Sequence, residues 1–124
     1  MQEETKNFLD SYALIELIEG NPEYKKFAEQ PIYTSSVNLV ELAYHFAQKY
    51  PAGKLTKMVF LLNPQMIEIK PEQITKIALF RKENASKKFS YIDCIGYILA
   101  RENRMVFITG DKAFKNMPNV GFVQ

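Results

Sequence analysis

Aspartate is scarce in this sequence, and each aspartate stands where its carboxylate could bind a cation. Only three of the 14 acidic residues are aspartates, and two of them follow extended apolar runs, Asp10 after residues 6–9 and Asp111 shortly after residues 105–108. Because the carboxyl ends of parallel strands open onto one crevice, we expect these two side chains to lie close together. Carboxylate oxygens suit hard cations such as Mg²⁺. An aspartate after a strand can also simply cap the next helix.

The third aspartate, Asp93, lies inside the longest apolar stretch of the chain, in the first turn of an expected helix. A carboxylate buried there without a partner would be costly or protonated. Gly96, one turn along on the same side, would let another group approach closely. The alternative is an acid placed favourably at a helix N-terminus. The apolar neighbours favour a functional role.

Glu41 shares a helix face with Asn38 and His45, and this spacing alone predicts that the face is solvated. His45 is the only histidine, and a lone helical histidine does not by itself predict catalysis. The apolar neighbours of Cys94 predict a small core residue rather than a nucleophile. A single cysteine also excludes an internal disulfide and a multi-cysteine zinc site. The sequence has no P-loop, GxGxxG, GxSxG or HExxH motif.

Short apolar runs alternate with amphipathic segments along the chain. This alternation predicts a parallel α/β sheet covered by helices on both faces, a three-layer α/β/α fold with four to five strands. Ser11 is expected to be the N-cap of the first helix, which ends at Gly20. Strands are expected at residues 6–9, 32–34, 66–69, 105–108 and 120–123, and further helices at 23–30, 37–50, 55–62, 71–82 and 90–103.

The length and composition are those of one globular domain spanning residues 1–124, with 47% apolar and 24% charged residues. The net charge of +2 neither demands nor forbids a nucleic-acid partner. The N-terminus is acidic and lacks the apolar core of a signal peptide, and Asp93 interrupts the longest apolar stretch. The sequence therefore predicts a cytoplasmic protein that does not span a membrane.

Four segments, in this order, resemble the motifs of the PIN domain family. Each motif alone is weak, but all four in order over a chain of this length are far more specific. Length and motif order are similar to those of the small VapC-type toxins of toxin–antitoxin systems, and the resemblance covers essentially the whole chain. The segments are Phe8-Leu9-Asp10-Ser11, Asn38-Leu39-Val40-Glu41, Ser90-Tyr91-Ile92-Asp93 and Thr109-Gly110-Asp111.

The resemblance implies a metal-dependent endoribonuclease that hydrolyses RNA phosphodiester bonds with Mg²⁺ or Mn²⁺ as cofactor. Such ions supply an activated water and stabilise charge on the phosphate and leaving oxygens. The match places Glu41 in the site, which its spacing alone does not. The implied catalytic and metal-binding residues are Asp10, Glu41, Asp93 and Asp111.

Other positions are expected to support this chemistry. Thr109 matches a hydroxyl position of the family, and together with Ser11 it is expected to order the acidic site. Some members carry a further acid after the last motif, where Lys112 and Ala113 stand here. The candidate RNA contacts are Lys112, Arg81, Lys82, Lys87 and Lys88.

Two alternatives remain open at this stage. A response-regulator receiver domain is also α/β, has a similar length and binds Mg²⁺ through acids at strand ends. It needs adjacent acids after the first strand and a lysine at the end of the last, whereas Ser11 follows Asp10. The second alternative is a PIN-like scaffold that binds RNA or protein without cleaving it.

The resemblance also implies partners: a small antitoxin protein and a second copy of the chain. Residues 57–62 of the helix expected at 55–62 have more apolar surface than one core face requires, so a partner could cover them.

Overall fold

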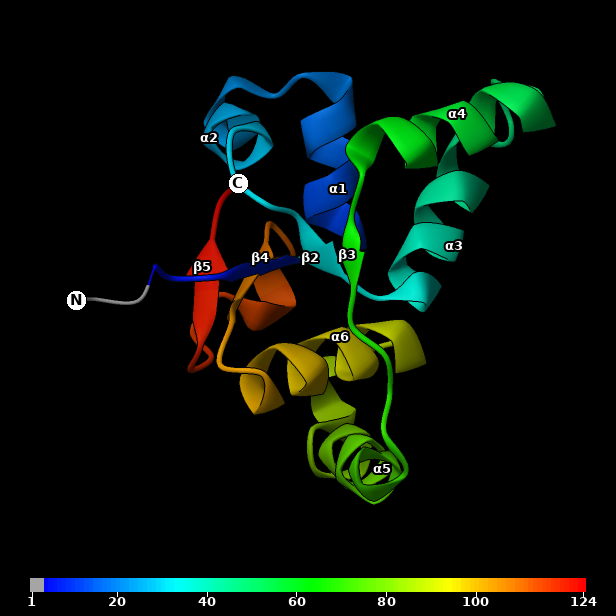
Figure 1. Ribbon diagram of the computed structural model, residues 1–124. Coiled ribbons are helices and arrows are strands. Elements are labelled where there is room, and N and C mark those ends of the chain that lie inside the picture. Colours follow the sequence, from blue (N-terminus) through cyan, green and yellow to red (C-terminus); the bar gives the residue numbers. More distant parts are fainter. Residues whose placement is uncertain (1–3) are drawn as a thin grey trace.

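The computed structural model describes residues 4–124, which form a five-stranded parallel sheet with helices on both faces (Figure 1). The strand order is β3-β2-β1-β4-β5, and β1 and β4 pair at the centre, with Leu9 opposite Ile108. The predicted three-layer fold is thereby confirmed. The strands are β1 (Asn7–Leu9), β2 (Tyr33–Thr34), β3 (Gln65–Met66), β4 (Val106–Thr109) and β5 (Val120–Phe122).

The helices lie close to their predicted positions, with differences at the ends. The helix expected to reach Tyr50 ends at Phe46, because the chain closes there in tight turns that Pro51 follows. The segment that begins at Pro71 opens as a 3₁₀ turn before it becomes α-helical. The six α-helices of residues 4–124 are α1 (Ser11–Glu19), α2 (Lys25–Ala28), α3 (Ser36–Phe46), α4 (Ala52–Leu62), α5 (Ile74–Glu83) and α6 (Tyr91–Glu102).

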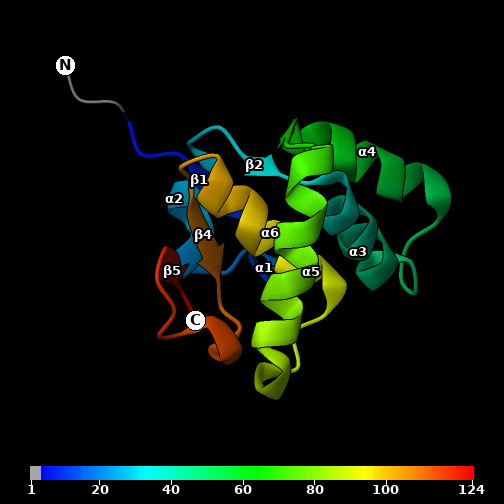
Figure 2. The same ribbon diagram turned by 90° about the horizontal axis from the view of Figure 1, so that it is seen from below.

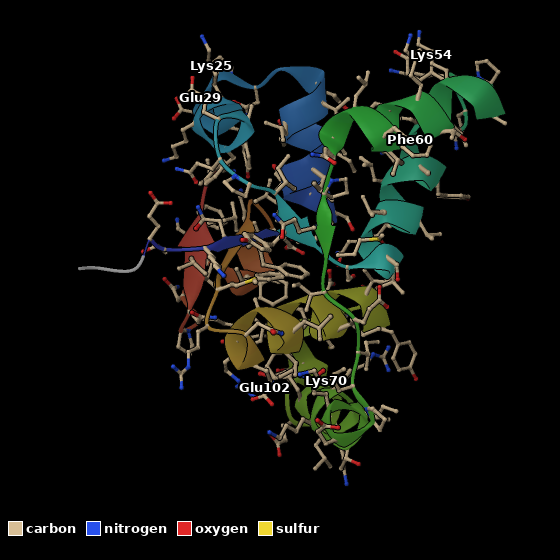
Figure 3. All side chains as sticks on the ribbon, viewed as in Figure 1. Lys25, Glu29, Lys54, Phe60, Lys70 and Glu102 are labelled. Atoms are coloured by element: carbon tan, nitrogen blue, oxygen red, sulfur yellow. The ribbon has the colours of Figure 1, made fainter. Side chains whose placement is uncertain are left out.

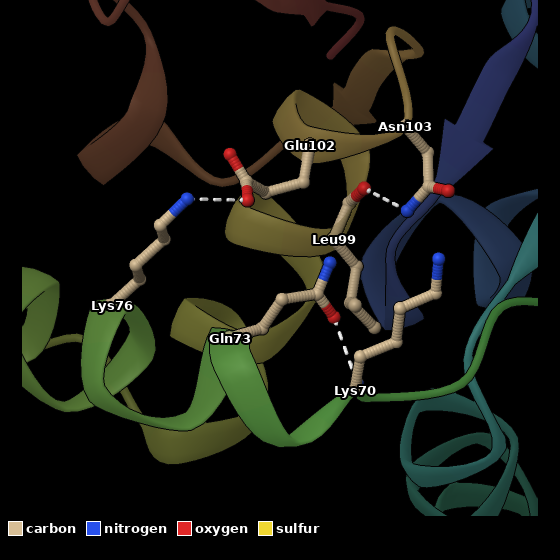
Figure 4. A network of polar contacts seen from close by, with 6 residues as sticks. All are labelled: Lys70, Gln73, Lys76, Leu99, Glu102 and Asn103. Atoms are coloured by element: carbon tan, nitrogen blue, oxygen red, sulfur yellow. Dashed lines mark hydrogen bonds and ion pairs between the residues drawn. The ribbon is translucent and has the colours of Figure 1, made fainter.

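Side-chain alternation along the central strands builds a separate core on each face of the sheet. Phe8 and Phe107 belong to the core formed with α5 and α6, whereas Leu9 and Ile108 belong to the core formed with α1, α2 and α3. Figure 2 shows α5 and α6 together on one side of the strands. Between these two helices, Lys76 donates to Glu102 at 2.8 Å (Figure 4).

The strand order separates this fold from the receiver-domain alternative. Receiver domains place their strands in the order 2-1-3-4-5, which differs from the order observed here. None of the helices in residues 4–124 has the length and apolar character needed to cross a membrane.

Candidate active site

The four acidic side chains singled out from the sequence line one pocket of about 650 Å³ at the carboxyl edge of the sheet. Asp10 follows β1 and Asp111 lies just beyond β4, two paired central strands. Asp93 lies in the first turn of α6, and Glu41 is in the middle of α3. Helices α3 and α6, from opposite faces of the sheet, therefore meet the carboxyl ends of β1 and β4, and all four carboxyl groups line the same pocket.

Each aspartate is held by a hydrogen bond from the backbone next to it. Asp10 is the N-cap of α1 and accepts from the N–H of Ala13 at 2.8 Å, so the prediction that Ser11 caps this helix is wrong. The reason is that the backbone is still extended at Asp10, and Ser11 is already the first helical residue. Asp111 accepts from the N–H of Ala113 at 3.0 Å.

Asp93 and Ser90 form a reciprocal capping box at the start of α6. The Asp93 carboxylate accepts from the N–H of Ser90 at 2.9 Å, and the Ser90 hydroxyl accepts from the N–H of Asp93 at 3.0 Å. In all three aspartates the cap engages one carboxylate oxygen. The same side chain can therefore offer its second oxygen to the pocket.

Asn38 lies in the core of the site, contrary to the expectation that its helix face is solvated. Its side chain is only 1% exposed, because α3 packs against both α1 and α6. The Asn38 amide donates to the Ser11 hydroxyl at 3.0 Å, and its oxygen accepts from the Ser35 hydroxyl. A Cβ added to Gly96 would lie 3.5 Å from the Asn38 oxygen, so α6 approaches the same point.

Asn38 therefore lies where α1, α3 and α6 meet, the helices associated with Asp10, Glu41 and Asp93. Helical periodicity does not predict this buried position. The N-cap hydroxyl of Ser35, three residues before it, was the one local cue.

Thr109 links the two aspartates that follow the central strands. Its side chain is fully buried and its hydroxyl accepts from the N–H of Asp111 at 3.0 Å. Hydrogen bonding between Thr109 and Asp10 also favours the charged form of Asp10. Ser11 is buried too, and it contacts Asn38 rather than capping α1.

Burial makes the pocket a costly place for negative charge. It raises the pKa of Asp10 from 3.8 to about 7, with a smaller contribution from the charges of Asp93 and Asp111, against the hydrogen bonds of Thr109 and Ala13. Burial also raises the pKa of Asp93, and Asp111 and Glu41 add to this effect, against the hydrogen bonds of Ser90. A bound cation would remove this cost.

The donor set fits a hard divalent ion that keeps part of its water shell. Among residues 4–124, no three Asp, Glu, His or Cys side chains converge closely enough to form a complete metal-binding group. Mg²⁺ commonly binds proteins through one or two carboxylates, with waters and substrate phosphates as its other ligands. Four carboxylates around one pocket match that requirement.

The remaining residues of interest lie around this pocket. His45 is at its rim and pairs with Glu19 at 3.3 Å, both side chains being about half exposed. Cys94 is buried, as predicted, and burial raises its pKa to about 11, which suits a core thiol. Lys87 donates to the carbonyl of Ala113, next to the exposed Lys112. The other candidate RNA contacts, Arg81, Lys82 and Lys88, line a different pocket.

Comparisons with known proteins agree with this arrangement. A toxin–antitoxin complex from Klebsiella pneumoniae contains a chain with 25% sequence identity and a TM-score of 0.74, covering 94% of this chain and 96% of that one. VapBC2 from Rickettsia felis, bound to a DNA fragment from its promoter, matches with 19% identity and a TM-score of 0.73, covering 96% and 98%. PAE2754 from Pyrobaculum aerophilum matches with 13% identity and a TM-score of 0.69, covering 96% and 91%.

The search of curated proteins gave no significant match. The pattern of the PIN domain family matches residues 8–120, nearly the whole chain. This protein therefore belongs to the PIN domain family, whose members are generally nucleases.

Proposed function

We propose that this protein is a metal-dependent endoribonuclease and the toxin of a toxin–antitoxin pair. The observation that carries the proposal is the single pocket lined by Asp10, Glu41, Asp93 and Asp111. Its carboxylates are held in place by helix caps and are costly to charge without a cation. An acidic pocket would repel a phosphate backbone, so the proposed activity requires the ion that these oxygens suit.

Mg²⁺ or Mn²⁺, when bound, would supply an activated water and stabilise negative charge on the phosphate and leaving oxygens. We assign Asp10, Asp93 and Asp111 as ligands, direct or through water. Glu41 has no hydrogen bond within residues 4–124, so its carboxylate is free either to bind the ion or to orient a water. Thr109 and Asn38 hold the elements that carry these groups. We assign Lys112, which follows Asp111, and Lys87, which donates to the carbonyl of Ala113, as contacts to the substrate phosphates.

Cleavage of single-stranded RNA with and without Mn²⁺ tests the proposal. We expect cleavage in Mn²⁺, none in excess chelator, and none with Asp93→Asn, which keeps the volume and can still accept from Ser90. Glu29→Gln changes an exposed acid (labelled in Figure 3) that lines a different pocket from the four site acids, and this matched control should cleave normally. Undiminished cleavage in chelator or by Asp93→Asn would refute the assignment, and a chain that binds RNA but never cleaves it would be the silent scaffold.

We propose a small antitoxin and a second copy of the chain as partners. The Klebsiella chain comes from a toxin–antitoxin complex. Helix α4 has no buried residue here, and Phe60 and Leu61 are 77% and 75% exposed. Apolar area of this kind is typical of an interface. Light scattering of the chain alone should give a dimer mass, and Leu61→Asp should weaken either the dimer or the complex with a co-expressed antitoxin. Unchanged assembly in both measurements would place the partners on another face.

A further inference from the structure

A second pocket, of about 300 Å³, lies between the end of α5 and the start of α6 and combines an aromatic ring with positive charge. The Tyr91 side chain is 64% exposed, although it stands two residues from Asp93. The Arg81 guanidinium carbon lies 4.0 Å from the centre of the Tyr91 ring, and its Nε donates to the carbonyl of Phe89 at 3.2 Å. These two contacts fix the guanidinium against one face of the ring.

The charge around this ring is not neutralised by the protein. Segment 81–91 contains four basic residues and one acidic residue, a net charge of +3 against +2 for the whole chain. Within residues 4–124, the ion pairs are Glu19–His45 and Lys76–Glu102, so Arg81, Lys82 and Lys88 have no acidic partner. Lys82 and Lys88 border the same pocket and are exposed. Such a site favours an anionic ligand with a flat, stackable group.

We propose that these four residues form a nucleotide-binding subsite beside the acidic pocket, where an unpaired base of an RNA strand stacks on Tyr91. Arg81 covers one face of the ring, and the base takes the other. Lys82 and Lys88 bind the phosphate attached to that nucleotide. This inference rests on the proposed function and adds to it a point at which the substrate strand is held. Base stacking on an exposed aromatic ring is tolerant of sequence, so the subsite positions the strand rather than selecting a base.

Tyr91 and Asp93 lie two residues apart in the first turn of α6, so the subsite and the acidic pocket adjoin the same end of this helix. A strand held by its base at Tyr91 passes the N-terminus of α6 and presents its neighbouring phosphate to the carboxylates. The ring therefore acts as a positioning group, and its loss should weaken binding without altering the acidic pocket.

Fluorescence anisotropy with the full chain, in chelator and at low salt, tests the subsite apart from catalysis. The probes are a labelled ten-nucleotide single-stranded RNA and the same strand with abasic positions. Tyr91→Ala should weaken binding of the intact strand about 10-fold, and Tyr91→Phe should bind like the wild type. Lys88→Ala should reduce the dependence of log K on log salt concentration by about 0.7. Lys25→Ala removes an exposed lysine of α2 that lines neither pocket, and it should leave the affinity for both strands unchanged.

The abasic strand separates stacking from other effects. Wild type and Tyr91→Ala should bind it equally, because the abasic strand offers no base to stack. The proposal is overturned if Tyr91→Ala binds intact RNA like the wild type, or if the variant loses affinity by the same factor for the intact and the abasic strand. It is also overturned if segment 81–91 binds an acidic peptide and not RNA. Asp93→Asn should bind RNA at least as tightly as the wild type in this assay, because in chelator it removes one negative charge from the acidic pocket. If Asp93→Asn still cleaves RNA while Tyr91→Ala loses binding, the catalytic assignment fails and the subsite stands.

Discussion

Replacing Asp10 with asparagine should stabilise the metal-free protein, and the gain should depend on pH. Asp10 is 4% exposed, and burial raises its pKa to about 7. Asparagine keeps the volume of the side chain and an oxygen that can accept from the N–H of Ala13. The substitution therefore removes the charge and preserves the cap.

The direction follows from proton binding in the two states. Below about pH 4, Asp10 is protonated in both the folded and the unfolded chain and costs nothing. Between pH 4 and 7 the unfolded chain loses this proton first, so the wild type loses stability as pH rises and reaches a constant penalty above pH 7. A shift of about three pKa units corresponds to about 4 kcal/mol, at about 1.4 kcal/mol per unit. For a chain of this length that is a difference in melting temperature on the order of 15 °C.

Thermal and urea unfolding from pH 4.5 to 8.5, in chelator, measures the effect. The free energy of unfolding of Asp10→Asn minus that of the wild type should rise with pH and level off near pH 8, and Glu29→Gln should show no such rise. A difference that stays constant with pH, or a variant less stable than the wild type at pH 8, would refute the reasoning and leave Asp10 a structural cap alone. With 10 mM Mg²⁺ and a dissociation constant of about 1 mM, the wild type should gain about 1.4 kcal/mol at pH 8, and Asp10→Asn should lose most of that gain.

Three further substitutions separate the roles proposed for the site. Asp93→Asn should abolish RNA cleavage at an unchanged circular dichroism spectrum, and cleavage at the wild-type rate would contradict its assignment as a ligand. Glu41→Gln should lower the cleavage rate far more than His45→Ala does, whereas a histidine base would reverse the ranking. Asn38→Ala should lower the free energy of unfolding by about 1–3 kcal/mol, because the Ser11 and Ser35 hydroxyls lose a buried partner. Asn38→Ala should also reduce RNA cleavage. If urea unfolding gave this variant the same stability as the wild type, the hydrogen bonds of Asn38 with Ser11 and Ser35 would not be formed in the protein.

The fold could be predicted from the sequence because apolar runs alternate regularly with residues that end helices and strands. Gly20 adopts the left-handed backbone that ends α1, as its position predicts. The predictions were wrong at the ends of some helices and strands. Residues 47–50 look like a continuation of α3, yet Pro51 and the turn before it end the helix at Phe46. Residues 67–69 look like a strand, but the pairing of the edge strand β3 with β2 ends at Met66, and beyond it only the N–H of Ile67 donates to β2, to the carbonyl of Thr34 at 2.7 Å.

The site was less accessible, because its geometry depends on how helices pack across the sheet edge. Helical periodicity assigns Asn38 and Glu41 to a solvated face, because it describes one helix alone and does not include the packing of α6 against α3. A Cβ added to Gly96 would lie 3.1 Å from the Phe107 ring and 3.5 Å from the Asn38 amide oxygen, so this glycine lets α6 come close both to the sheet and to this face of α3. Only the order of the motifs placed Glu41 correctly in the pocket.

Each of the three aspartates can cap a helix and bind a metal ion at the same time. The backbone hydrogen bond that caps a helix also restrains the direction of the carboxylate, so one oxygen stabilises the fold while the second can be offered to the pocket that these residues line. Glu41 differs, because it stands in the middle of a helix and its longer side chain has no such anchor within residues 4–124. Fixed carboxylates suit the holding of an ion in one place. An unanchored carboxylate can either bind the ion or follow a water as the substrate changes, and these are the two roles that we propose for Glu41.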